Sequence, residues 1–309
     1  MMVTLTDCSD LTIVIPAFNE QAGIVATLRS LTDEAGSAEI IVVDDCSTDG
    51  TVEAARSFAN VKVLRHDFNC GQGAALKTGM RSATRAYVAW FDADNEHRVV
   101  DLARLYDRIK SDRLVACIGQ RTTGSASLTR AVGKALIRQI GWGLKIRSGS
   151  DLNCGLRIFR RGIILRYLSL IPNRFSASLV STLIMLERRY PIAFEGVQTN
   201  DRVGTSSVRL RDGFEAILQL VRSVLLFAPM RFFLPIGIVS FMVGVVYSLV
   251  IALIVGQGLP VGGMFLLVTG VQILILGLLG LLGDQLSQLR LSQMGDVSPS
   301  SENVDQDNV

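Results

Sequence analysis

The chain has 309 residues, of which 49% are apolar and 19% are charged, and its formal net charge is +3. This length allows a sizeable buried core and more than one structural unit, but the apolar fraction is too high for an ordinary soluble domain of this size. We expect no nucleic-acid partner. The five cysteines are scattered, odd in number and without metal-type spacing, which indicates reduced thiols in a cytosolic domain.

The first part of the chain alternates between apolar strands and helices. We expect strands at 11–18, 39–45, 61–66, 87–94 and 114–121, and helices at 20–35, 51–59, 73–83 and 99–111. Near-continuous apolar strands that alternate with helices are typical of a mostly parallel sheet covered on both faces. The sequence therefore predicts an α/β fold whose ligands bind beyond the carboxyl ends of the strands.

The pattern loosens after this region. Residues 122–150 contain a basic segment with apolar residues on one side. This pattern is compatible with a core helix and with an amphipathic helix at a membrane surface. We then expect a helix at 175–190 and a strand at 192–198, which complete a catalytic domain over residues 1–210.

Two uncharged stretches, residues 232–255 and 263–283, hold the excess of apolar residues. As helices they would reach roughly 36 and 31 Å, and the hydrocarbon core of a bilayer is about 30 Å thick. This favours a transmembrane hairpin over residues 231–285 rather than two buried core helices. We expect an amphipathic juxtamembrane helix before it, at 211–230, and a polar, acidic, disordered tail after it, at 286–309.

Positive charge is distributed unevenly around this hairpin. The approach to the first span contains Arg202, Arg209, Arg211, Arg222 and Arg231. Arg290 follows the second span, and the link between the spans carries no charge. Basic residues favour the cytoplasmic side, so we expect both termini in the cytoplasm. The first ten residues have neither a basic end nor an apolar stretch, and we expect no cleaved signal.

Three carboxylates lie at the end of the fourth expected strand and just after it, in the stretch "VAWFDADNEHR". They are Asp92, Asp94 and Glu96. A D-x-D pair at a strand end directs both carboxylates to one place, where a hard divalent cation such as Mg²⁺ or Mn²⁺ can bind. The alternative is a solvated acidic turn.

A second acidic pair, Asp44 and Asp45, ends the second expected strand. Such carboxylates can accept hydrogen bonds from a nucleobase and from ribose hydroxyls, and Glu20 follows the first strand at the same edge of the sheet. The alternative is a capped helix, because the next residues are good helix caps. The glycines of residues 69–75 lack the third position of a dinucleotide-binding fingerprint, which argues against an NAD site.

The ordered motifs "VIPAFNE", "VVDDCSTDGT", "NCGQGAALKTG" and "FDADNE" resemble glycosyltransferase family 2, whose nucleotide-binding fold is called GT-A. The later stretches "DLNCGLRIFRR" (151–161) and "RVGTSSVR" (202–209), followed by a hairpin, are similar to the branch that transfers sugars to polyprenyl phosphates. Dolichyl-phosphate mannose synthase and bacterial undecaprenyl-phosphate sugar transferases are examples of that branch.

The resemblance implies roles for particular residues. The nucleoside would be held by Pro16, Ala17, Glu20, Asp44 and Asp45, with help from Lys77. The metal on the diphosphate would be held by Asp92 and Asp94, with Glu96 where the branch usually has glutamine. The phosphates and the acceptor would be contacted by Arg121, Arg130, Asp151, Arg157, Arg202 and Ser206.

The reaction that the resemblance implies is inverting transfer of a sugar from a nucleotide-diphosphate sugar to undecaprenyl or dolichyl phosphate. It would take place at the cytoplasmic leaflet, in the plasma membrane of a prokaryote, as a step toward a cell-envelope glycan. A family 2 enzyme that acts on another membrane lipid or glycan, and a non-catalytic membrane scaffold derived from the fold, are the alternatives. The sequence leaves open whether several copies of the chain form a homo-oligomer.

Overall fold

A computed structural model describes residues 8–121, 154–174, 177–200, 229–256 and 260–295. The chain forms two compact units, Met1–Val221 and Arg222–Val309. The basic segment 122–150, the amphipathic helix expected at 211–230 up to residue 228, and the end of the tail lie outside the described residues.

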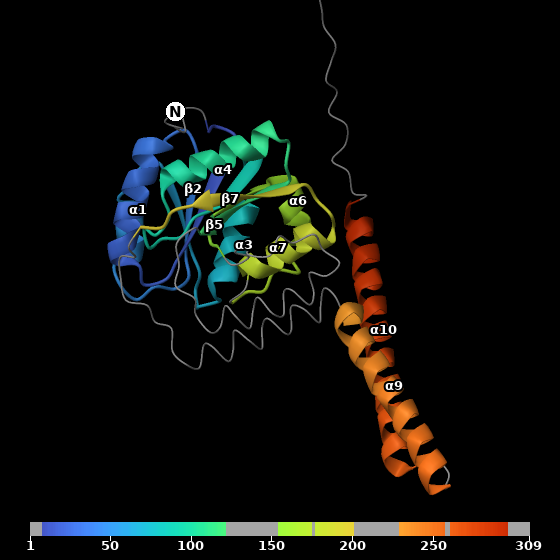
Figure 1. The fold of residues 1–309 in the computed structure, drawn as a ribbon. Coiled ribbons are helices and arrows are strands. Elements are labelled where there is room, and N and C mark those ends of the chain that lie inside the picture. The colour runs from blue at the N-terminus through green and yellow to red at the C-terminus, as the bar shows by residue number, and fades with distance from the viewer. Residues whose placement is uncertain (1–7, 122–153, 175–176, 201–228, 257–259, 296–309) are drawn as a thin grey trace, which may run out of the picture. The chain divides into compact units, whose positions relative to one another are not determined.

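The first unit contains a seven-stranded sheet with the order β3-β2-β1-β4-β6-β5-β7 (Figure 1). The strands are β1 (Leu11–Ala17), β2 (Glu39–Asp44), β3 (Val61–Arg65), β4 (Tyr87–Trp90), β5 (Ala116–Arg121), β6 (Arg157–Arg160) and β7 (Ile192–Val197). β1 pairs in parallel with β2 and β4, β2 with β3, and β5 with β7, whereas β6 runs antiparallel between β4 and β5. The prediction of a mostly parallel α/β sheet is confirmed.

Helices cover both faces of this sheet. Successive side chains of a strand point to opposite faces, and the strands carry apolar side chains on both, so both faces must be buried. The helices are α1 (Gln21–Glu34), α2 (Thr51–Arg56), α3 (Gln72–Ser82), α4 (Val99–Ser111), α6 (Arg161–Ile164) and α7 (Ala177–Glu187), with a short 3₁₀ turn, η1 (Leu165–Tyr167). Apolar residues of α1 and α4 share one core with Ile13 and Ile15 of β1. Gly79 of α3 lies against Val14, on the opposite face of the same strand.

The fourth strand is shorter than the sequence pattern predicts. It ends at Trp90 rather than at residue 94. The main-chain N–H of Phe91 still donates to the Val14 carbonyl at 3.1 Å, but the chain then turns, and Asn95 has a φ of 59°. Asp92 and Asp94 therefore lie in a turn beyond the strand. The strand β6 was not predicted from periodicity.

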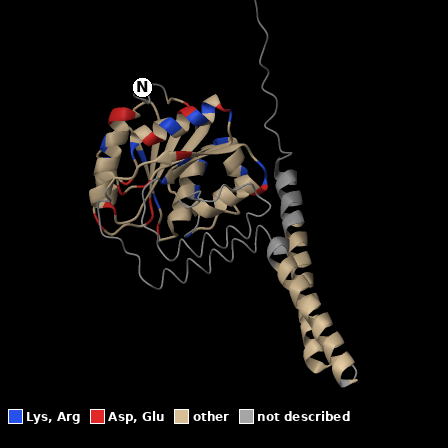
Figure 2. Ribbon diagram, viewed as in Figure 1, with Lys and Arg blue, Asp and Glu red and all other residues tan. Residues whose placement is uncertain are grey.

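The second unit contains two long apolar helices, α9 (Pro229–Val255) and α10 (Val261–Gly295). Phe233–Ile254 and Val261–Gly283 are long and apolar enough to cross a membrane, and only 17% and 11% of their most apolar windows are buried. That exposure argues against the core helices of a soluble protein. In Figure 2 the described apolar part of the hairpin is tan throughout, with no segment coloured as Lys, Arg, Asp or Glu.

Glycines let the two helices of the hairpin approach closely. A Cβ atom added to Gly270 would lie 2.8 Å from the main-chain nitrogen of Phe241, and one added to Gly244 would lie 2.9 Å from that of Leu267. Small residues at such contacts are typical of helices that pack within a bilayer.

The prediction of a disordered tail over residues 286–309 is wrong in one respect, because α10 continues through residues 286–295 to Gly295.

Candidate active site

The loops that follow β1, β2 and β4 lie at one edge of the sheet, because these strands are parallel neighbours. The acidic turn, which we define as residues 92–97, follows β4. Thr27 of α1 supports it, since its Oγ1 donates to the Ala93 carbonyl and accepts from the Asn95 N–H, both at 3.1 Å. A Cβ atom at Gly23 would lie 2.7 Å from the same carbonyl, so α1 packs closely against the turn.

The carboxylates of the acidic turn have defined neighbours. Asp92 Oδ2 lies 3.0 Å from Nε2 of His97, and Asp92 Oδ1 accepts from Nε2 of Gln72 at 3.3 Å. Asp94 Oδ1 accepts from the main-chain N–H of Glu96 at 3.1 Å. Asp92 keeps 26% of its side chain exposed, which leaves it reachable from the open edge of the sheet.

Arg121, at the end of β5, reaches the same place. Its Nη1 lies 3.6 Å from Oε1 of Glu96, and both side chains are about one-quarter exposed. The structure therefore brings together two residues that the sequence assigned separately, one to the phosphates and one to the metal. A guanidinium beside carboxylates makes a site that can hold both a cation and a phosphate group.

The charges of this site shift the pKa values of two of its members. Burial by itself raises the pKa of the Asp92 carboxyl, but the hydrogen bond and the charge of His97 lower it. The charges of Arg157 and Arg121 act in the same direction, so the pKa of Asp92 lies below its usual value. Burial lowers the pKa of His97, and the hydrogen bond to Asp92 with the surrounding carboxylates raises it by more.

The residue types of the acidic turn suit a hard divalent cation, although among the described residues their oxygens do not gather within 4.8 Å of one another as the ligand atoms of Asp45, His66 and Cys70 do. Asp92, Asp94 and Glu96 offer carboxylate oxygens within one short turn, and such oxygens are the ligands that Mg²⁺ and Mn²⁺ prefer. Asp92 is ionised at neutral pH, as a ligand must be. These three residues would hold the cation if one binds.

Arg157, which the resemblance places beside the acceptor, lies inside the protein. Its side chain is fully buried, and its guanidinium lies 5.3 Å from the centre of the Trp90 ring. The hydrogen-bond acceptors of the guanidinium are the carbonyl oxygens of Cys154 and Ser178 and the hydroxyls of Ser181 and Thr182. These described contacts support the site, and contact of Arg157 with the acceptor phosphate stays a prediction.

Asp44 and Asp45 are also turned into the protein. Asp44 is fully buried and accepts from the main-chain N–H of Ser47 at 3.1 Å, with Arg65 3.4 Å away. Asp45 accepts the main-chain N–H groups of Cys70 and Gly71 at 2.9 and 2.7 Å. These bonds brace the two loops that border the expected nucleoside cleft, and direct contact with a nucleoside stays a prediction.

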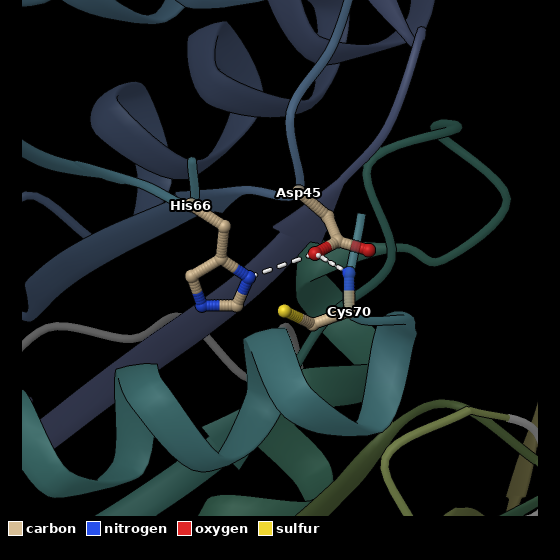
Figure 3. Close-up of side chains that lie close together, drawn as sticks. All are labelled: Asp45, His66 and Cys70. Carbon is tan, nitrogen blue, oxygen red and sulfur yellow. Dashed lines mark hydrogen bonds and ion pairs between the residues drawn. The ribbon is translucent and has the colours of Figure 1, made fainter. Parts of the chain in front are cut away.

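Asp45, His66 and Cys70 form a cluster at this end of the site (Figure 3), with their potential ligand atoms within 4.8 Å of one another. The spacing of the cysteines gave no sign of it. His66 Nδ1 lies 2.7 Å from Asp45 Oδ1, and Nε2 lies 3.0 Å from Thr78 Oγ1, so both ring nitrogens have partners. A cation would have to break the bond between His66 and Asp45, and we interpret the cluster as a hydrogen-bonded brace.

The remaining expected nucleoside residues lie at the same edge. Pro16 and Ala17 end β1 and are buried, and the Ala17 carbonyl accepts from the Asp45 N–H at 2.9 Å. Glu20 precedes α1, and its main-chain N–H donates to Thr51 Oγ1 at 3.0 Å. Lys77 donates to the Ile171 carbonyl at 3.0 Å and to the side chain of Asn173, so its described contacts secure residues 171–173.

Four expected site residues, Arg130, Asp151, Arg202 and Ser206, lie outside the described residues. The structure adds two residues that the sequence did not assign, His97 and Gly155. His97 stands next to the acidic cluster in the sequence, which could have marked it. Gly155 gave no local signal, because its role depends on a contact with Asp92 across the sheet.

Comparison with known proteins agrees with this geometry. Residues 12–168 match the family described as Glycosyl transferase family 2. The chain belongs to glycosyl transferase family 2. It is therefore a glycosyltransferase by family, and residues 228–289 match a second family, the GtrB C-terminal hairpin.

Among the relatives of this family 2 protein, the undecaprenyl-phosphate 4-deoxy-4-formamido-L-arabinose transferase of Aeromonas hydrophila is 27% identical over 89% of this chain and 88% of its own length. The dolichyl-phosphate beta-glucosyltransferase of Saccharomyces cerevisiae is 27% identical over 50% of this chain and 56% of its own. Uncharacterized protein MJ1222 of Methanocaldococcus jannaschii is 35% identical, and the match covers 48% of this chain and 63% of that protein.

The solved structures that resemble the chain share its fold. Glucosyl-3-phosphoglycerate synthase of Mycobacterium tuberculosis, in complex with Mn²⁺, UDP-glucose and phosphoglyceric acid, superposes with a TM-score of 0.52 at 19% identity. The superposition covers 70% of this chain and 78% of the synthase. The GT-A fold expected from the sequence is confirmed.

Proposed function

We propose that this protein transfers a sugar from a nucleotide-diphosphate sugar to a polyprenyl phosphate, with inversion at the anomeric carbon, at the cytoplasmic leaflet of a membrane. The observation that carries the proposal is the meeting of Asp92, Glu96 and Arg121 at the carboxyl edge of the sheet. The apolar hairpin supports a very apolar acceptor, and the relatives named for undecaprenyl and dolichyl phosphate support a polyprenyl phosphate.

The reaction follows from the charges of its participants. An oxygen of the polyprenyl phosphate is already anionic at neutral pH and attacks the anomeric carbon, so no strong general base is required. The bond between that carbon and the diphosphate oxygen breaks, and its electron pair leaves with the nucleoside diphosphate. A divalent cation, when bound, would neutralise part of the charge that develops on the departing diphosphate.

The residues of the chain supply position and charge for this step. Asp92, Asp94 and Glu96 would hold the cation, Mg²⁺ or Mn²⁺, and Arg121 would contact a phosphate group. The attacking phosphate oxygen and the departing diphosphate must lie on opposite sides of the anomeric carbon. Holding both in this geometry accounts for much of the acceleration in such reactions. Asp45 and its brace would shape the nucleoside end of the site, and Asp151, Arg130, Arg202 and Ser206 remain assigned to the phosphates and acceptor by resemblance.

The membrane arrangement is part of the same proposal. The helices α9 and α10 would span the plasma membrane of a prokaryote, with the catalytic unit and both termini in the cytoplasm, because the flanking arginines favour that side.

A panel of sugar nucleotides, each incubated with undecaprenyl or dolichyl phosphate and the full-length protein in detergent, tests the proposal. We expect one sugar nucleotide to give a glycosylated lipid of the expected mass. Transfer to a different lipid would support the alternative acceptor, and transfer to none would support the scaffold.

Arg121→Ala tests the phosphate contact within that assay. A charge-assisted phosphate contact contributes about 1.5–3 kcal/mol, or roughly ten- to 150-fold in rate or affinity. Arg29→Ala is the matched control, because Arg29 is an exposed arginine of α1. Equal rates for the two variants would show that Arg121 contacts no phosphate.

A further inference from the structure

We propose that His97 and Gly155 are positioning residues that fix the carboxylate of Asp92 for the divalent cation. The inference rests on the proposed function, because it takes a cation at the acidic turn as given. It adds a histidine from one end of that turn and a glycine from a distant segment to the residues on which the cation site depends.

His97 is placed to orient one oxygen of Asp92. Its side chain is 2% exposed, and its Nε2 lies 3.0 Å from Asp92 Oδ2. An ionised carboxylate only accepts hydrogen bonds, so Nε2 carries the hydrogen and donates it. The ring of Phe91 packs edge-on against the imidazole, with 5.7 Å between ring centres, and this contact limits rotation of the histidine.

The other oxygen of Asp92 has a neighbour of its own, since Oδ1 accepts from Gln72 at 3.3 Å. Each carboxylate oxygen can accept about two bonds, so both oxygens keep acceptor capacity for a cation. The two donors therefore fix the plane of the carboxylate without using up its ability to bind a metal.

The main chain at Gly155 lies directly against the side chains of Asp92 and His97. A Cβ atom at position 155 would lie 2.1 Å from Asp92 Oδ2 and 2.9 Å from His97 Nε2. The contact arises from strand pairing, because β4 and β6 are antiparallel with Trp90 opposite Arg157, and the same register continued by two residues sets Gly155 opposite Asp92. Only a glycine allows the pair of side chains to lie this close to the main chain.

Arg157 secures the main chain that carries Gly155. Its Nε donates to the Cys154 carbonyl at 3.1 Å, and the opposite end of the guanidinium bonds to α7 through Ser181 and Thr182 at 2.9 and 3.1 Å. This gives the buried arginine a supporting role in the site.

Hydrogen bonds to metal ligands commonly set metal affinity, and their loss typically costs about 10–100-fold. Without His97 the Asp92 side chain would gain rotamers that point away from the cation, and binding would have to select the productive one. We therefore expect His97 to affect the affinity for metal itself as well as turnover.

The experiment measures Mn²⁺ binding to the full-length protein in detergent, by the electron paramagnetic resonance signal of the free ion. His97→Leu and His97→Gln are compared, because the two replacements have similar volume and only the glutamine amide can donate to Asp92. Arg29→Ala is the control, because Arg29 is exposed on α1 and is not part of the site.

We expect His97→Leu to weaken Mn²⁺ binding about 10–100-fold, with His97→Gln close to the wild type and Arg29→Ala unchanged. Gly155→Ala gives an independent arm if the leucine variant does not fold, and it should also weaken Mn²⁺ binding. Wild-type affinity in both His97→Leu and Gly155→Ala would overturn the inference while leaving the cation site intact. Absence of Mn²⁺ binding by the wild-type protein would overturn the cation site, and the inference with it.

Discussion

Gly155→Ala is the perturbation that the structure constrains most closely. The added methyl carbon would lie 2.1 Å from Asp92 Oδ2. A carbon and an oxygen in contact normally stay about 3.3 Å apart, so the carboxylate or the main chain of residue 155 must retreat by roughly 1 Å. The bonds of Arg157 to Cys154 and to α7 hold the main chain of this segment. The Asp92 side chain, which is 26% exposed, is therefore the part that can move.

A displacement of about 1 Å at a reacting centre can lower the rate on the order of 100-fold. We expect Gly155→Ala to reduce transfer of a labelled sugar into organic-extractable lipid by about that factor. The same overpacking should destabilise the protein by about 1–3 kcal/mol, which thermal unfolding in detergent will measure. The loss of rate should therefore appear at temperatures where the variant is still folded.

Gly162→Ala is the matched control for this substitution. Gly162 lies in α6, and a Cβ atom there would have no neighbour within 4 Å. We expect wild-type transfer and equal or slightly higher stability, because alanine is favoured over glycine in a helix by about 0.5–1 kcal/mol. A Gly155→Ala variant that transfers sugar as fast as the Gly162→Ala variant would refute the reasoning.

Three further predictions follow from other parts of the structure. Asp94→Asn should abolish turnover while the protein still folds in detergent, and excess chelator should do the same to the wild type; full activity in chelator would contradict the cation site. Arg157→Ala should lower the midpoint of thermal unfolding, because it leaves the hydrogen-bond acceptors of a fully buried guanidinium unpaired. We expect the free energy of unfolding to fall by about 2–4 kcal/mol. An unchanged midpoint would mean that the buried arginine does not stabilise the fold. The topology can be tested in a cysteine-free background with an impermeant thiol reagent added to intact cells. A cysteine that replaces the exposed Val261 should react, and one that replaces the exposed Glu53 should not. The reverse pattern would contradict the proposed topology.

Local patterns in the sequence were sufficient for much of this fold. Apolar runs marked six of the seven strands of the described sheet. The signal is clearest for β1, β2 and β4, because a strand buried on both faces needs apolar residues on both. The uncharged stretches marked the hairpin for a similar reason, because a bilayer leaves no water for charged groups. The acidic turn could be recognised as well, since its three carboxylates stand within five residues of one another.

The short strand β6 and the side-chain directions were decided by tertiary structure. Four residues, "RIFR", carry too little periodicity to mark a strand, and β6 is stabilised by its pairing with β4 and β5 on either side. Its antiparallel register fixes the place of Gly155 beside Asp92. No pattern within residues 151–161 records that contact.

Arg157 and Arg121 illustrate the difference between a residue's type and its position. Both are arginines near strand ends, and the sequence treats them alike as phosphate ligands. Strand pairing turns Arg157 into the core between Trp90 and α7, whereas Arg121 emerges at the end of β5 beside Glu96. The sequence determined which charges this region contains. The packing of distant strands decided which of them lie inside the protein and which reach the end of the sheet, because the direction of a side chain depends on neighbours far away along the chain.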